Sequence, residues 1–322
     1  MISGKKRLLI TGASGFIGSH LLTILGNMDQ WAEIHALSRM PVVNMPINHR
    51  VVWHQADLLA DDRPTELIHQ IKPSHVVHAA WITEHGAFWE HQVNSAWLAA
   101  SLNLAEAFML SGGERFITLG SVAEYDWTQG RMIEGHTPET PSTLYGQAKL
   151  AFHHALTEHN KRGHFSSATC RIFYTYGPFE NPKRLVPLAC RSLITERSEA
   201  FGSGSLWRDY IHVSDLVRGI AAVLHSDLEG AVNIGSGAPV RISFLLDQLE
   251  KLSHKPGFLK RGQQADLGNE VMMLFADVCR LGKLGWRPIV SFEEGLNHTI
   301  QWWRQRLIGC PDLNQERQVL KI

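Results

Sequence analysis

The sequence predicts an α/β protein built on a doubly wound parallel sheet, with a smaller, discontinuous C-terminal subdomain. Short apolar segments alternate with longer amphipathic ones through the first half of the chain, as in parallel strands connected by helical crossovers. A glycine-rich segment directly follows the first apolar segment, where a strand would turn sharply into a helix. After Gly177-Pro178 the chain becomes richer in loops containing Pro, Arg and Gly. We therefore expect a first domain over residues 1–177, rejoined by segments near 207–235, a second subdomain mainly over 178–310, and a tail over 311–322.

Apolar runs of strand length predict the strands in order, each buried on both faces and separated by helices. These runs are residues 7–11, 33–38, 51–54, 75–78, 115–119 and 168–173. Beyond them, the pattern predicts a helix at 213–224 and a short strand near 232–234.

The composition excludes several classes of partner. The chain of 322 residues has 31 basic and 31 acidic side chains, so it lacks the basic surface expected for nucleic acid or an anionic membrane. The apolar stretch near the amino terminus is too short for a signal peptide or a membrane span. The four cysteines, Cys170, Cys190, Cys279 and Cys310, have no paired or metal-ligand spacing, which is typical of reduced thiols. We therefore expect a cytoplasmic protein.

The glycine-rich segment reads Thr11-Gly12-Ala13-Ser14-Gly15-Phe16-Ile17-Gly18. Three glycines at this spacing let the backbone approach a phosphate closely, and the amides of the following helix attract it. The segment therefore predicts a Rossmann turn that binds the pyrophosphate of NAD(P)(H). Its cofactor contacts would be Gly12, Ser14, Gly15, Phe16, Ile17 and Gly18. The alternative is an ordinary strand-to-helix turn, which its position after the first predicted strand disfavours.

Residues after the second and third strands predict how the adenosine half of the cofactor is bound. The second strand ends in Ser38-Arg39, where NAD enzymes carry an acidic residue and where an arginine accommodates a 2′-phosphate. We therefore expect NADP(H), with NAD(H) as the alternative. Asp57 and Leu58 follow the third strand and are placed to meet the adenine. The alternative for Arg39 and Asp57 is an exposed loop position without a ligand.

Three residues predict acid–base chemistry. Tyr145 and Lys149 are four residues apart on a predicted helix, so both side chains project from the same face. A lysine cation stabilises a phenolate and lowers the pKa of the tyrosine, which lets Tyr145 exchange a proton with a substrate oxygen. Lys149 could also hold the nicotinamide ribose. Ser121 lies just after the fifth strand, where its hydroxyl can bond the reacting carbonyl or alcohol.

Taken together, the sequence resembles an extended short-chain dehydrogenase/reductase of the NAD-dependent epimerase/dehydratase family. The resemblance covers nearly the whole chain. The segments that match the family are residues 11–18, Asp57-Leu58, His78-Ala79-Ala80, Ser121, 145–149, 171–178, 208–215 and 233–237. It implies a Rossmann fold, a nucleotide-diphosphate sugar as substrate, hydride transfer to or from a nicotinamide, cofactor contacts at Ala79 and Ala80, and a homodimer.

Two departures from the family pattern narrow the expected activity. Family members that dehydrate hexoses resemble Thr-Asp-Glu where this chain has Ser121-Val122-Ala123, so the acid and base for removing water are missing. Epimerases of the family usually resemble Asn, which touches the substrate diphosphate, where Tyr174 stands. The second change puts the inherited diphosphate contact in doubt and favours a reductase.

The resemblance also indicates where a nucleotide sugar would bind. Arg208 is similar to the arginine that grips the diphosphate, and its alternative is a surface ion pair with Asp209. Arg184 and the segment around Val186 would line the base and phosphate. A cluster after the fourth strand could contact the sugar ring or could simply be packing. It contains Trp81, Thr83, Glu84, His85 and Trp89.

The 18 histidines do not predict a metal site. His153 and His154 are adjacent on a predicted helix and should point apart, and no triad with a carboxylate is evident. His78 and His212 match family positions, where we expect structural hydrogen bonds.

The preferred hypothesis is a 4-ketoreductase acting on a nucleotide-linked 4-keto-6-deoxy sugar. An NAD-dependent 4-epimerase is the main alternative, and a catalytically silent NADP-binding sensor or scaffold comes from a different functional class. A reductase of carbonyl compounds without a nucleotide is a further alternative. The Ser38-Arg39 pair favours the reductase because reductases consume NADPH.

Overall fold

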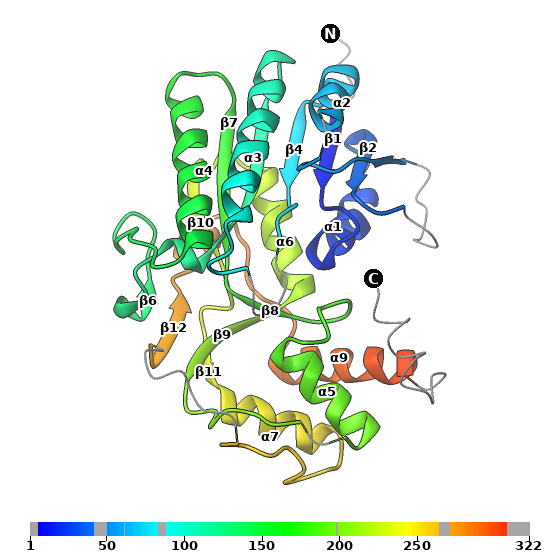
Figure 1. Cartoon of the computed structure of the whole chain (residues 1–322), viewed down its shortest axis with the longest axis vertical. Helices are drawn as coiled ribbons and strands as arrows, with labels where there is room; N and C mark the ends of the chain where they lie inside the picture. Colours follow the sequence, from blue (N-terminus) through cyan, green and yellow to red (C-terminus); the bar gives the residue numbers. More distant parts are fainter. Residues whose placement is uncertain are drawn as a thin grey trace.

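The computed structural model describes residues 6–41, 50–60, 62–82, 88–197, 199–263 and 271–307. Figure 1 shows a larger lobe, in which helices cover a parallel sheet, above a smaller lobe of helices and short strands. Among the described residues, no helix combines the length and the apolar character needed to cross a membrane.

The larger lobe is organised by a seven-stranded sheet in the order β10-β7-β5-β4-β1-β2-β3, in which all pairs are parallel. Its strands are β1 (Lys6–Thr11), β2 (Trp31–Ser38), β3 (Val51–Gln55), β4 (His75–His78), β5 (Arg115–Ser121), β7 (Ser166–Ile172) and β10 (Gly230–Ile234). All the strands predicted from apolar runs are confirmed, including the short strand near 232–234. The strand order reverses at β1, with β2 on one side and β4 on the other.

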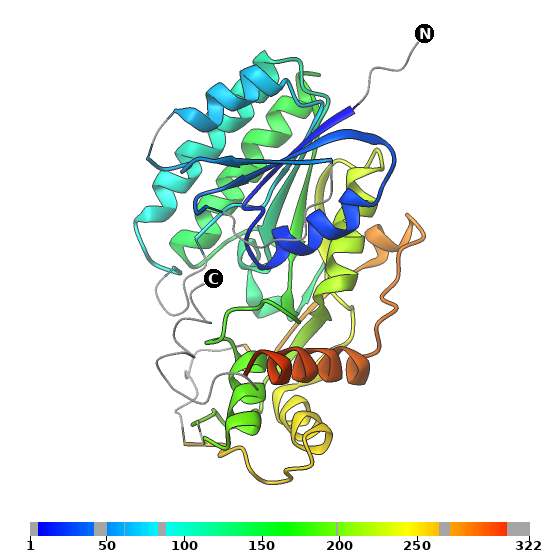
Figure 2. The same ribbon diagram turned by 90° about the vertical axis from the view of Figure 1, so that its right-hand side faces the viewer.

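Helices cover both faces of the sheet (Figure 2). On one face lie α1 (Phe16–Gly26) and α6 (Val213–Leu224), and on the other lie α2 (Arg63–Ile71), α3 (Val93–Leu110) and α4 (Leu144–Lys161). The helix predicted at 213–224 is confirmed. Helices also fill the other predicted gaps, except between β2 and β3, where residues 42–49 lie outside the described part of the chain.

The expectation that every strand is buried on both faces is wrong for β3. This strand has a neighbour only on its β2 side, and Val52 is 41% exposed. By contrast, β4 and β5 are buried along their whole length. An edge strand has one unpaired side and incomplete helix cover, so its apolar residues do not guarantee burial.

The smaller lobe is built around a second sheet in the order β11-β9-β12-β6, with β8 added alongside β9. Its strands are β6 (Arg131–Met132), β8 (Tyr174–Tyr176), β9 (Trp207–His212), β11 (Pro239–Arg241) and β12 (Met273–Ala276). The helices α5 (Leu185–Thr195), α7 (Ile242–Leu252) and α9 (Phe292–Leu307) enclose its core, and the short helix α8 (Cys279–Gly282) contacts β10.

The chain passes between the lobes several times. The strand β8 begins two residues after β7 ends, and it pairs with β9 in the second sheet. Of the segment expected to rejoin the first domain, α6 and β10 pack on the main sheet, whereas β9 belongs to the second one. The domain boundaries stay a prediction, and the tail over 311–322 lies outside the described residues.

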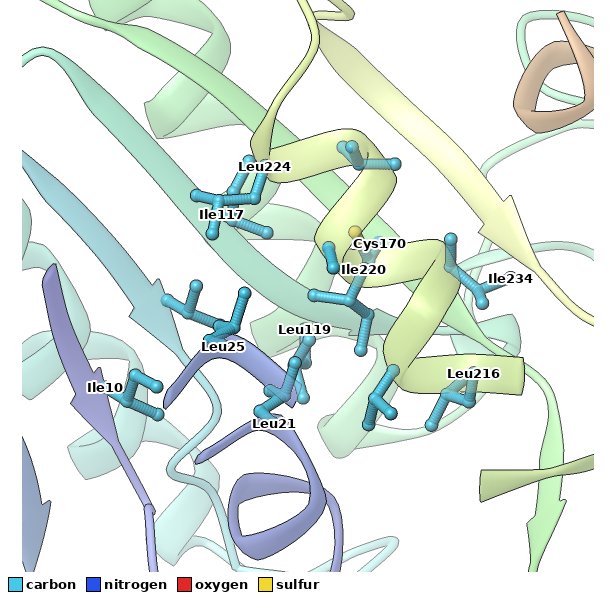
Figure 3. Close-up of a cluster of buried hydrophobic side chains, with 14 of the residues drawn as sticks. Ile10, Leu21, Leu25, Ile117, Leu119, Cys170, Leu216, Ile220, Leu224 and Ile234 are labelled. Atoms are coloured by element: carbon cyan, nitrogen blue, oxygen red, sulfur yellow. The ribbon is translucent and has the colours of Figure 1, made fainter. Parts of the chain in front are cut away.

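The main core forms where α1 and α6 pack on the sheet. Figure 3 shows Leu21 and Leu25 from α1 and Ile220 from α6 among strand side chains such as Leu119 and Cys170. These side chains interdigitate between two helices and the sheet, so a shortened side chain there leaves a cavity.

Replacing Ile220 by alanine tests this core. Ile220 is 0% exposed, and Ile220→Ala should lower the free energy of unfolding by about 2–5 kcal/mol. The same substitution at Ile289, which is 62% exposed, should change it by less than about 0.5 kcal/mol. Urea denaturation followed by circular dichroism measures both, and equal losses would contradict this description of the core.

Candidate active site

The three glycines of the β1–α1 turn differ in how much space a side chain would find at each position. Gly12 has a φ of +66°, and a Cβ there would lie 2.8 Å from the Cα of Ala80. A Cβ on Gly18 would collide with the carbonyl oxygen of Gly12, so Gly18 lets α1 pack tightly on the turn. Gly15 has a single neighbour, the Gly12 oxygen at 3.2 Å. Space is therefore left open only at Gly15, where a ligand could approach the backbone.

The amino terminus of α1 is suited to an anion. Its N-cap is Gly15, which offers no side-chain hydrogen bond, and the first turn contains no acidic residue. The first amides of a helix have no partner within the helix and lie at the positive end of its dipole. The open space at Gly15 and these amides fit the pyrophosphate of a dinucleotide. Phe16 and Ile17 pack with their side chains against the main core.

Residues expected around the adenosine lie at the ends of β2 and β3. The Ser38 hydroxyl is buried, 2.8 Å from the Ser14 hydroxyl, and it donates to the Met40 carbonyl at 2.8 Å. Arg39 next to it is exposed. The Asp57 carboxylate accepts the Leu59 amide at 3.0 Å. Arg39 is therefore free to face solvent or a ligand, whereas Ser38 serves the turn itself. Leu58 packs against the core beneath α2 and α3.

The structure brings Ser121, Tyr145 and Lys149 together at the carboxyl end of β5. All three are buried, with exposures of 9%, 7% and 5%. The Ser121 hydroxyl lies close enough to the Tyr145 phenol to lower its pKa. The carbonyl of Trp89 accepts the Tyr145 amide at 3.0 Å, and the Thr143 hydroxyl caps α4. The first turn of α4 is therefore anchored on both sides, which orients the phenol.

Burial governs the protonation of this group. It raises the pKa of Tyr145 to about 12, against the opposing influence of Ser121. It lowers the pKa of Lys149 to about 7, against the opposing negative charge of Glu124. The Lys149 ammonium donates to the Leu119 carbonyl at 2.7 Å and lies 3.9 Å from the centre of the Trp81 ring. The expected lowering of the Tyr145 pKa toward neutral pH is not found, because desolvation of the phenolate outweighs the influences of Ser121 and Arg184 that lower it.

An aromatic wall surrounds Tyr145. Phe88 and Trp89 meet its ring edge-to-face, with centroids 4.9 and 5.6 Å away. Trp81 donates its indole N–H to Asn94 at 3.0 Å and stacks on Trp97, so its ring serves packing inside the protein.

Sequence analysis named only part of this wall, and three residues of the predicted sugar cluster fall outside the described part of the chain. Thr83, Glu84 and His85 lie outside the described residues. Sequence analysis missed Phe88, which belongs to the same aromatic run, and Asn94, which bonds the Phe88 carbonyl at 2.7 Å.

The smaller lobe contributes two arginines to this region. Arg208 is 4% exposed, donates to the Tyr174 hydroxyl at 3.1 Å and to the carbonyl of Val271 at 2.9 Å. The alternative of an ion pair with Asp209 is wrong, because that buried carboxylate accepts backbone amides of residues 236, 237 and 276. Arg184 lies over the Phe88 ring, at 5.4 Å from its centre.

The electrostatic effect of Arg184 reaches Tyr145. Its positive charge is among the influences that lower the pKa of Tyr145, so the guanidinium lies nearer the reacting group than predicted. Val186 is 1% exposed and packs in the core of the smaller lobe. Its side chain is therefore not placed to line a binding surface.

The histidine expectations have mixed outcomes. His78 and His212 make structural hydrogen bonds as expected, with the hydroxyl groups of Thr11 and Ser101 and with the amide of Ser214. The expectation that His153 and His154 point apart from each other and from any carboxylate is wrong, because their nitrogens and a Glu139 oxygen all lie within 4.8 Å.

This cluster nevertheless has another explanation than a metal ion. Glu139 pairs with the buried guanidinium of Arg171 at 2.7 Å, and His153 shares a hydrogen bond with the Thr169 hydroxyl at 2.9 Å. A cation bound here would lie close to the fixed positive charge of Arg171, which disfavours it.

The chain is similar to known proteins in sequence and in structure. A sequence model of the "NAD dependent epimerase/dehydratase family" matches residues 8–235. UDP-glucose 4-epimerase of Rhizobium leguminosarum bv. trifolii is 26% identical, over 92% of this chain and 97% of that protein. UDP-glucuronic acid decarboxylase 1 of Xenopus tropicalis is also 26% identical, over 94% of this chain and 73% of that protein.

Solved structures give the same result for the fold. MoeE5 in complex with UDP-glucuronic acid and NAD superposes with a TM-score of 0.78 at 28% identity, over 93% of this chain and 99% of that one. UDP-glucuronic acid 4-epimerase from Bacillus cereus superposes with a TM-score of 0.81 at 24% identity, over 93% and 99%. The predicted Rossmann fold is confirmed.

Gly15→Ala should weaken dinucleotide binding without unfolding the chain. The added methyl meets only the Gly12 oxygen at 3.2 Å, but it occupies the space through which a pyrophosphate would approach. We expect the Kd for NAD(H) or NADP(H) to rise about tenfold or more, the equivalent of about 1.4 kcal/mol. Gly282→Ala is the control, since a Cβ there has no neighbour within 4 Å. Fluorescence titration measures both, and unchanged binding by Gly15→Ala would refute this pyrophosphate site.

Proposed function

The chain belongs to the NAD-dependent epimerase/dehydratase family and is an NAD(P)-dependent enzyme of the short-chain dehydrogenase/reductase class; from this premise we propose that it reduces the 4-keto group of a nucleotide-linked sugar. The observation that supports this proposal best is the Ser121–Tyr145 pair. The serine hydroxyl is close enough to the phenol to lower its pKa, but burial outweighs this effect and raises the pKa of Tyr145 to about 12. Tyr145 therefore retains its proton at neutral pH and is ready to give it to a ketone oxygen.

The neighbouring residues restrict what this pair can do. Val122 and Ala123 follow Ser121 in a short 3₁₀ helix, and neither can act as an acid or a base. Elimination of water from the sugar needs such groups, so a dehydratase is not proposed.

The proposed reaction assigns one step to each residue. The bound cofactor supplies a hydride to C4 of the sugar. Ser121 donates a hydrogen bond to the C4 oxygen, and Tyr145 transfers its phenolic proton to that oxygen, which becomes a hydroxyl. The resulting phenolate faces the Lys149 ammonium, which stabilises it until a proton from solvent restores the phenol.

Arginines at the end of β2 and in the smaller lobe complete the proposed binding mode of the cofactor and the substrate. Arg39 is exposed at the end of β2, where a guanidinium can pair with the 2′-phosphate of NADPH. Arg184 lies over Phe88 and influences Tyr145, and Arg208 bonds the Tyr174 hydroxyl in the smaller lobe; both would receive the diphosphate of the substrate. On the family resemblance alone we also propose a homodimer.

A 4-epimerase that retains NAD is the second candidate. MoeE5, at 28% identity, has been crystallised with UDP-glucose and NAD. An epimerase would use the same three residues in both directions, with Tyr145 accepting the hydroxyl proton before returning it. It would leave the cofactor unchanged over a full cycle.

Turnover distinguishes the two candidates. We expect NADPH absorbance to fall when dTDP-4-keto-6-deoxyglucose is added, and Tyr145→Phe to reduce the rate by about 10²–10⁴-fold. If NADPH is not consumed and UDP-glucose or UDP-glucuronic acid is converted to its 4-epimer with NAD, the reductase proposal is wrong. Absence of both reactions, with the cofactor bound, would support a silent binding protein.

Arg39→Ala should separate the two cofactors. Loss of a charged hydrogen bond to the 2′-phosphate, worth about 1.5–3 kcal/mol, should raise the Kd for NADPH about tenfold or more. The Kd for NADH should stay within about twofold, because NADH lacks that phosphate. Parallel titrations with both cofactors measure this difference, and equal changes would remove the basis for preferring NADPH.

A further inference from the structure

A buried carboxylate lies directly behind the catalytic serine. Glu124 is 0% exposed. One of its oxygens accepts the Ser121 amide at 2.7 Å, and the other accepts the Arg171 Nε–H at 2.7 Å. The Ser121 hydroxyl in turn accepts the Ala123 amide at 3.1 Å. Glu124 and Ser121 thus form a reciprocal capping box that closes the turn between β5 and the following 3₁₀ helix.

The surrounding backbone leaves room for this carboxylate. A Cβ on Gly120 would collide with the Glu124 carboxylate and would lie 2.6 Å from the Thr169 methyl. Only a glycine at position 120 therefore lets the carboxylate reach the Ser121 amide.

A buried ion pair lies behind the turn. Arg171 is 0% exposed and pairs with both Glu124 and Glu139, each at 2.7 Å. Glu139 is partly exposed, whereas the Glu124 charge is fully buried together with its arginine partner. Burying such a group is costly, and well-packed apolar residues would often stabilise the fold equally well. The network therefore costs more folding free energy than a purely structural role would require.

Lys149 is the catalytic group that experiences this charge. Its ammonium donates to the Leu119 carbonyl, on the strand that leads into the Ser121 turn, and the negative charge of Glu124 opposes the effect of burial on its pKa. The other titratable groups facing Lys149 in the described structure are His78 and Tyr145. Burial lowers the pKa of His78 to about 3 and raises that of Tyr145 to about 12, so both are neutral at neutral pH.

We propose that Glu124 is a positioning residue of the active site, which holds the Ser121 turn in place and carries the negative charge that keeps Lys149 in its ammonium form. The proposal rests on the proposed function, because it assigns Ser121 and Lys149 their roles in carbonyl reduction. Glu124 itself would touch neither the sugar nor the cofactor. It acts through Ser121 and Lys149.

The test compares Glu124→Gln with Glu139→Gln. Both remove one charge from the Arg171 network, but only Glu124 bonds the Ser121 turn. We expect Glu124→Gln to lower kcat by about 10–100-fold, as misplaced catalytic groups do, with the Kd for NADPH within about twofold. Glu139→Gln should keep kcat within about threefold of the wild type. Equal losses of kcat in the two variants would overturn the proposal.

The pH profile separates positioning from general destabilisation. An ammonium at Lys149 is lost as pH rises through its pKa of about 7, so wild-type activity should decline above that pH. Without the Glu124 charge the pKa of Lys149 falls, and the decline in Glu124→Gln should move to lower pH. Glu124→Asp keeps the charge but withdraws it from the Ser121 amide, so it should keep the wild-type pH profile with a reduced kcat. An unmoved decline in Glu124→Gln would refute the charge role.

A measurement without substrate makes the outcome independent of the proposed function. Hydrogen exchange of the Ser121 amide, followed by mass spectrometry of peptides covering 115–125, should accelerate in Glu124→Gln and stay unchanged in Glu139→Gln. If the wild type reduces no nucleotide sugar but this exchange pattern is found, the function is wrong and the turn is still held by Glu124. If the exchange is unchanged, the positioning role is wrong whatever the substrate.

Discussion

The junction between β1 and β4 is the constraint on which the rest of the structure depends. The strand order reverses here, and in open α/β sheets ligands bind outside the carboxyl ends of the strands at such a point. The Thr11 hydroxyl accepts the Ala80 amide and bonds His78, whose other nitrogen bonds Ser101. Since Gly12 lies against Ala80 without a Cβ, the turn and the strand end can stay this close.

The candidate site requires polar side chains to be buried, which is unfavourable in free energy. Tyr145, Lys149 and Glu124 are polar and nearly inaccessible to solvent, and burying such groups is unfavourable unless each finds partners. The partners here come from the Leu119 carbonyl, the Ser121 turn and the Arg171 guanidinium. The candidate site is thus a packed interior whose protonation states are set by desolvation and by the buried charge of Glu124.

Local patterns predicted those parts of the protein that depend on neighbouring residues. Apolar runs gave the strands, and the glycine spacing gave the turn. Predictions failed where a distant partner decided the outcome. Glu139 reaches His153 and His154 from a loop, and Val186 packs in the core of the smaller lobe. For Arg208, the structure rules out the alternative partner Asp209 and shows contacts with Tyr174 and Val271. The role of Glu124 gave no sequence signal beyond an acidic residue after an apolar strand.

The sequence by itself determined the fold class, and it was enough to predict a phosphate-binding turn and the Ser121, Tyr145 and Lys149 set. Periodicity, glycine spacing and helical spacing are properties of residues close in the chain. The tertiary structure alone decided how buried these groups are, and which charges they face. Both depend on the packing of segments far apart in sequence, such as Arg171 of β7 against Glu124. Desolvation and charge pairing act through space, so no linear pattern records them.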